Sequence, residues 1–171
     1  MKRNRGFSLI ELLIVVAIIL IIAAIAIPSL LRAKIAADEA SAAAAIRSIN
    51  TAEFAYNASF PTNGYTNLAN LGGAAPCKPS PLTACLIDNV LATAIAGSTG
   101  KSGYIFAATG VLPNGATNLS FVSAASPSSY NITGVRDFCS TEDGVIRFDA
   151  GQSGNVPVID LPSCRAFTVM Q

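Results

Sequence analysis

The sequence predicts an α+β protein in which one long N-terminal α-helix packs on a small antiparallel β-sheet head. Three observations favour this class: a long apolar run, a stretch after it with helical periodicity, and a C-terminal region of short β-type runs separated by turn residues. At 171 residues the chain has room for one modest domain beside the apolar run. We expect a basic start at 1–6, a membrane-spanning helix half at 7–31, an amphipathic helix half at 32–60 and a globular head at 61–171.

The apolar run from Phe7 to Leu31 is long enough to cross a membrane. A helix rises about 1.5 Å per residue, and a bilayer core is about 30 Å thick. Lys2, Arg3 and Arg5 precede the run, and the positive-inside rule keeps such a cluster in the cytoplasm. The C-terminal part of the chain is therefore expected on the outer side of the membrane.

Glu11 is the one charged residue inside this run. An ionisable group in a membrane segment costs on the order of 2.5 to 3.5 kcal/mol at the centre and less near an end, so it usually has a partner. If the chain were cut between Gly6 and Phe7, the new α-amino group would lie one helical turn from Glu11, or could meet the Glu11 of a neighbouring subunit. Either pairing would offset the cost of burying both charges.

These residues carry a resemblance to a known family. The stretch KRNRG followed by FSLIELLIVVAII resembles the class III signal of type IV prepilins and of type II secretion pseudopilins. The resemblance implies cleavage after Gly6 by a prepilin peptidase, N-methylation of Phe7 and a role for Glu11 in setting subunit register. It also implies the type IV pilin fold and polymerisation with other copies of the chain into a pilus filament.

The resemblance also implies partners and locations. Before assembly the chain would be a single-pass protein in the lipid of the bacterial inner membrane, with its C-terminus in the periplasm. The pilus assembly machinery would then move it into a filament on the cell surface. No enzymatic activity and no cofactor is expected, and a chain without histidine lacks the commonest general base. With residues 1–6 removed, eight basic residues face ten acidic ones, which does not favour nucleic-acid binding.

Other classes of protein share parts of this N-terminus. An ordinary secretory signal would be cut near Ala24-Ile25-Ala26, but its apolar core is usually about 7 to 15 residues, and 12–27 is longer and follows a glutamate. A plain single-pass anchor, carrying a monomeric binding or enzymatic domain, would keep Lys2 to Arg5 and form no filament. A pseudopilin of a type II secretion system, or a subunit of a DNA-uptake pilus, would share the whole signal.

The stretch after Pro28 is rich in alanine and contains no further proline before Pro61. Pro28 is expected to kink or loosen the helix without starting a separate one, and Pro61 with Asn63-Gly64 is expected to end it. The larger apolar side chains recur at helical spacing, at Ile35, Ala42, Ile46, Ile49, Tyr56 and Phe60. We expect the charged residues to lie mostly off this stripe, at Arg32, Asp38, Glu39, Arg47 and Glu53.

Four cysteines, an even count in a segment expected outside the cytoplasm, favour disulfides. Three pairings are possible. The short separation of Cys77 and Cys85, which flank a proline-rich turn, favours a local bridge. A Cys139–Cys164 bridge would resemble the disulfide-closed C-terminal loop of many pilins. The spacing lacks the C-x2-4-C pairs of zinc sites.

The head is expected to contain one short helix and five strands. The helix is predicted from about Thr83 to Ile95, with Leu86, Val90 and Leu91 on one side. Pro113-Asn114-Gly115 and Asp143-Gly144 are the turn signals. The predicted strands are 104–109, 119–124, 130–139, 145–148 and 166–170.

Two further patterns suggest a phosphate-binding loop and a calcium site, but we predict neither site. The stretch from Gly97 to Ser102 ends like a phosphate-binding loop, but Ile95 stands where the first glycine of that motif belongs. Five acids in the C-terminal quarter could ligate calcium, but we interpret them as solvated turn residues. They are Asp137, Glu142, Asp143, Asp149 and Asp160.

Overall fold

The computed structural model describes residues 7–115, 117–151 and 156–170. The predicted leader at 1–6, with Gly6, lies outside the described residues. The chain divides after Lys34 into two compact units, and the second begins at Ile35. The boundaries that we predicted between membrane segment, amphipathic half and head remain predictions.

Helix α1 (Leu9–Ser59) begins in the first unit and continues into the second, with Pro28 inside it. Among the described residues it is the one helix long and apolar enough to cross a membrane. Its most apolar 18-residue window has a mean hydropathy of 3.3 and no buried residue. Side chains of this kind require lipid or other protein around them.

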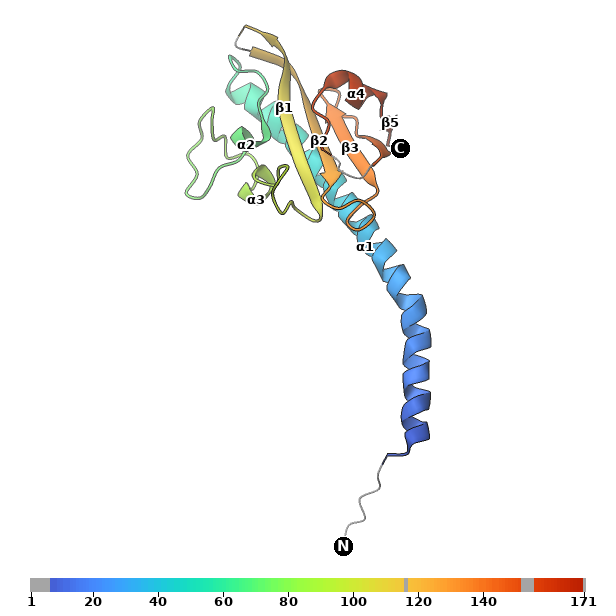
Figure 1. The fold of residues 1–171 in the computed structure, drawn as a ribbon. Coiled ribbons are helices and arrows are strands. Elements are labelled where there is room, and N and C mark those ends of the chain that lie inside the picture. The colour runs from blue at the N-terminus through green and yellow to red at the C-terminus, as the bar shows by residue number, and fades with distance from the viewer. Residues whose placement is uncertain (1–6, 116, 152–155, 171) are drawn as a thin grey trace. The chain divides into compact units, whose positions relative to one another are not determined.

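The second unit contains a five-stranded antiparallel sheet, which confirms the predicted fold class. Each strand pairs with the next in the chain, so the spatial order is β1 to β5 (Figure 1). A hairpin at Asn114 joins the two longest strands, as the turn signal there predicts. The strands are β1 (Tyr104–Asn114), β2 (Thr117–Pro127), β3 (Arg136–Thr141), β4 (Arg147–Ala150) and β5 (Thr168–Val169).

Both faces of the sheet are covered. On one face, Ile46 and other residues of the second half of α1 pack against Phe106 of β1 and Phe138 of β3. On the other face, helix α4 (Leu161–Ala166) packs against β2 and β3. Because successive strand residues point to opposite faces, β2 is buried on both sides from Ser120 onward. The buried residues that pack together on the α4 face of the sheet are Val122, Ala124, Cys139, Leu161 and Cys164.

The prediction that Glu39 and Glu53 lie off the apolar stripe of α1 is wrong. Both are buried, with exposed fractions of 4% for Glu39 and 0% for Glu53. The reason is helical spacing: Glu39 lies four residues after Ile35, and Glu53 lies four residues after Ile49, so both fall within the stripe. Their carboxylates therefore need partners inside the head.

The helix expected over 83–95 is wrong in extent. Helix α3 covers Asn89–Ala92 only, and its N-cap Asp88 accepts a hydrogen bond from the Leu91 backbone N–H at 2.8 Å. The residues before it hydrogen-bond to helix α2 (Leu68–Leu71) instead, with the Leu86 N–H donating to the Leu71 carbonyl at 2.8 Å. Val90, expected on the apolar side, is exposed. Tertiary hydrogen bonds here override local helical periodicity.

Three strand predictions also need correction, and one of them is the strand expected at 145–148, which begins only at Arg147 and ends at Ala150. The strand expected from Tyr130 begins only at Arg136, because 129–133 is a turn closed by a hydrogen bond from the Thr133 N–H to the Ser129 carbonyl. The strand expected from Ala166 is replaced in part by α4. Asp160 caps that helix by accepting from the Ser163 N–H at 2.9 Å.

Candidate functional site

The first turn of α1 holds the candidate assembly residues. Phe7 and Ser8 precede the helix, and Phe7 is 83% exposed. The Ser8 backbone N–H donates to Glu11 Oε2 at 3.0 Å, so the carboxylate satisfies one of the unpaired donors of this helix end. Sequence reasoning missed this contact, although S-x-x-E at 8–11 is the signature of a capping box.

The surface of α1 around this turn is apolar and open. All its large side chains from Leu9 to Leu31 are exposed, by 46% at the least. Small residues interrupt them and would permit close approach of another helix. These are Ala17, Ala23, Ala24 and Ala26.

Glu39 connects the second half of α1 to the start of β3 through hydrogen bonds and an ion pair. Its Oε1 accepts from the Val135 N–H at 3.0 Å, and its Oε2 accepts from Nε and Nη2 of Arg136, the first residue of β3, at 2.8 and 2.5 Å. The guanidinium also lies over the rings of Phe138 and Phe148, at 5.7 and 5.4 Å from their centroids. This buried carboxylate thus has partners on both oxygens, as its burial requires.

Glu53 is the second buried carboxylate of α1, and only one of its two oxygens accepts a hydrogen bond from the described residues. Its Oε2 accepts from the Thr66 N–H at 3.0 Å, but its Oε1 has no hydrogen-bond partner among the described residues. Burial disfavours the charged form and raises the pKa of Glu53 to about 8, although the Thr66 N–H lowers it somewhat. At neutral pH this side chain is therefore mostly protonated.

The raised pKa of Glu53 predicts that stability falls between about pH 4.5 and 8. Below this window the carboxyl is protonated in both states, and within it only the unfolded chain releases the proton, so the free energy of unfolding decreases as pH rises. The loss for a shift of this size is up to about 4 to 5 kcal/mol. The measurement is urea unfolding of the detergent-solubilised protein at pH 5 and pH 8.5.

Glu53→Gln supplies the control, because its amide does not titrate. The chain contains no histidine, so few other side chains change charge in this window. The variant should show a much smaller difference between the two pH values. An equal difference in both proteins would mean that Glu53 is ionised in the fold.

A neutral polar bridge lies on the same helix face. The Asn50 side-chain amide donates to Ser140 Oγ at 2.8 Å, and its carbonyl oxygen accepts from Ser123 Oγ at 2.6 Å. All three residues are buried, so the bridge joins α1 to β2 and β3 without leaving these groups unpaired. It sets the position of the helix along the sheet between the two glutamates.

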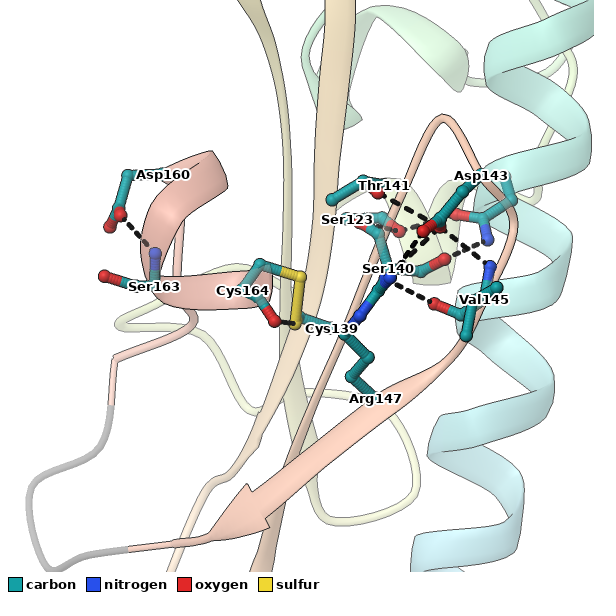
Figure 2. The surroundings of a disulfide bond; sticks show 11 residues. Ser123, Cys139, Ser140, Thr141, Asp143, Val145, Arg147, Asp160, Ser163 and Cys164 are labelled. Atoms are coloured by element: carbon teal, nitrogen blue, oxygen red, sulfur yellow. Dashed lines mark hydrogen bonds and ion pairs between the residues drawn. A yellow bond between two sulfur atoms is a disulfide. The ribbon is translucent and has the colours of Figure 1, made fainter. Parts of the chain in front are cut away.

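The structure pairs Cys77 with Cys85 and Cys139 with Cys164. The first bridge closes the loop after α2, and the second joins β3 to α4 across the face of the sheet (Figure 2). We expect non-reduced peptide mapping of the purified protein to find these two linkages. The longer loop should stabilise the head by about 2 to 4 kcal/mol. Free thiols, or a Cys85–Cys139 linkage, would contradict this connectivity.

Several acids of the C-terminal quarter have local partners. Asp143 accepts hydrogen bonds from Arg147 across the β3–β4 turn, which lower its pKa to about 2 (Figure 2). Glu142 pairs with Arg165 at 2.6 Å. No group of three or more potential metal-ligating side chains gathers anywhere in 7–115, 117–151 or 156–170.

Comparison with known proteins identifies the N-terminus. Residues 1–27 match the family described as the prokaryotic N-terminal methylation motif. Over 74 residues the chain is 42% identical to the type IV major pilin protein PilA of Myxococcus xanthus (strain DK1622), and the match covers 43% of this chain and 33% of that relative. The chain thus spans a third of the length of the curated relative that it matches. No solved structure matches it significantly.

The motif and the fold agree. The matched residues include the whole N-terminal signal and most of the apolar run of α1, and the second half of that helix packs on an antiparallel sheet. The chain therefore carries the N-terminal methylation motif and is similar, over part of its length, to a type IV major pilin.

Proposed function

We propose that this chain is the structural subunit of a type IV pilus. It is made as a prepilin in the inner membrane with its C-terminus in the periplasm. A prepilin peptidase cleaves it after Gly6 and methylates the new amino group of Phe7. The assembly machinery then polymerises it through its N-terminal helix into a filament on the cell surface.

The observation that carries this proposal is the exposed apolar half of α1. Its 18-residue apolar window has no buried residue, so a single copy leaves a large hydrophobic surface uncovered. Lipid covers such a surface before assembly, and the helices of neighbouring subunits replace the lipid in a filament. The relative named above is a major pilin, which supports a pilus over a secretion pseudopilus.

Glu11 supports the polymer in particular. The hydrogen bond from Ser8 occupies one oxygen of its carboxylate, and a carboxylate can accept about four hydrogen bonds. Glu11 can therefore cap its own helix and still accept from the amino terminus of another subunit. In the low-dielectric core of a filament that attraction is strong enough to set axial register.

The test is deletion of the gene followed by electron microscopy of filaments sheared from the cells. Filaments should be lost and should return when the wild-type gene is supplied on a plasmid. Immunogold labelling of the filaments with antibody against the head should be continuous along their length. Unchanged filaments in the deletion strain, together with loss of secreted enzymes, would favour a secretion pseudopilin instead.

A further inference from the structure

The disulfide loop after α2 presents one apolar side chain to solvent. Leu82, in the loop closed by Cys77 and Cys85, is 73% exposed. On either side of the Pro81–Leu82 pair, Ser80 and Thr83 exchange backbone hydrogen bonds of 3.0 and 3.1 Å. Because the loop is already ordered, the binding of this exposed leucine to a partner would cost little conformational entropy.

The same loop is also hydrogen-bonded to α1. The Tyr56 hydroxyl, on the buried stripe of the helix, donates to the Pro81 carbonyl at 2.8 Å. The hydroxyls of Ser80 and Thr83 are also hydrogen-bonded to each other, at 2.9 Å. The loop is therefore anchored to the core while its tip remains uncovered.

An apolar pocket of about 400 Å³ lies elsewhere in the same unit. It is lined by residues of α2 and the edge strand β1, by Ile95 and Ala96, and by Val156, Pro157 and Ile159. Three exposed apolar side chains surround it, Ile95, Val156 and Ile159, with exposed fractions of 47%, 69% and 55%. An apolar hollow with an exposed apolar rim is typical of an interaction site.

We propose that Leu82 of one subunit inserts into this pocket of another copy of the chain, an inference that rests on the proposed pilus function. Charge complementarity supports the pairing: Lys78 lies four residues before Leu82 in the loop, and Asp160 follows Ile159, which lines the pocket. Both are exposed, and neither forms an ion pair within the described ranges. Because Leu82 and the pocket are different parts of the surface, the contact is heterologous, and a heterologous contact whose rotation does not close builds an open helical filament.

Cross-linking between two chains tests this contact. One chain carries Leu82→Cys and the other Ala96→Cys, an exposed alanine lining the pocket, and both are expressed together in the strain that lacks the natural gene. We expect a disulfide-linked dimer in sheared filaments on a non-reducing gel. The matched control replaces Ala96→Cys with Ala58→Cys, an exposed alanine of α1 outside the pocket, and should give little dimer.

A second variant measures what the contact contributes. Leu82→Ser should lower filament yield about tenfold, as truncation of a central apolar anchor does, whereas Val90→Ser should leave it within about twofold. Both side chains are exposed, so thermal unfolding should be unchanged. Dimer formation equal with Ala96→Cys and Ala58→Cys, or full yield with Leu82→Ser, would overturn the contact while leaving the pilus function intact. Absence of filaments from the wild-type strain would overturn the proposed function itself.

Discussion

Glu11→Ala should abolish filaments while leaving the protein in the membrane. The substitution removes a polar group from the apolar segment, so insertion should be equal or better. In the filament, each buried amino terminus would lose its counter-charge, and neighbouring helices could slide. The measurement compares protein in the membrane fraction with sheared surface filaments, in a strain lacking the natural subunit.

Glu11→Gln separates the two contacts of this side chain. Its amide oxygen can still accept from the Ser8 N–H, as Glu11 Oε2 does at 3.0 Å, but it carries no charge. We expect it to fail in assembly as Glu11→Ala does. Filaments restored by glutamine would mean that helix capping is the required contact, and normal filaments with alanine would mean that apolar packing alone sets the register.

Glu39→Ala should destabilise the head by about 2 to 4 kcal/mol. This is somewhat less than breaking a fully buried ion pair costs, because Arg136 remains partly solvated. The substitution leaves the Val135 N–H without its acceptor and the Arg136 guanidinium without its carboxylate. Urea unfolding of the detergent-solubilised protein measures the change. Filament yield should fall with it, because α1 is less firmly held to the sheet.

Two control variants should each lose less stability than Glu39→Ala. Glu39→Gln keeps an acceptor for the Val135 N–H and should cost less than alanine. Asp88→Asn removes the exposed ion pair with Lys101 but keeps an N-cap side chain for α3, and should cost under about 1 kcal/mol. A loss with Glu39→Ala no larger than with Asp88→Asn would contradict the part assigned to this contact.

Local pattern was enough to predict the fold class. The apolar run and the alanine-rich stretch predict one long helix, and α1 continues through Pro28 to Ser59. Turn residues at Asn114 and Gly144 predict two of the sheet connections, because both positions favour tight turns between adjacent strands. These elements depend on residues close together in the chain.

The features that differ from the prediction depend on tertiary contacts or on short motifs at helix ends. Glu39 and Glu53 are predicted to lie off the apolar stripe of α1, although their spacing places both on it. The Ser8–Glu11 capping contact was visible as a motif, and so was the start of α4, where Asp160 stands two residues before Pro162. The short extent of α3 was not visible, because it follows from hydrogen bonds between the loop and α2.

Mass spectrometry of the N-terminal peptide, taken from sheared surface filaments, is the direct test of cleavage and methylation. If the chain is a processed pilin, the peptide begins at Phe7 and carries one methyl group on its α-amino nitrogen. Replacing Gly6 with leucine should leave an unprocessed precursor in the membrane, which serves as the control for cleavage. A mature chain that begins at Ile27, or one that retains Lys2 to Arg5, would contradict the account.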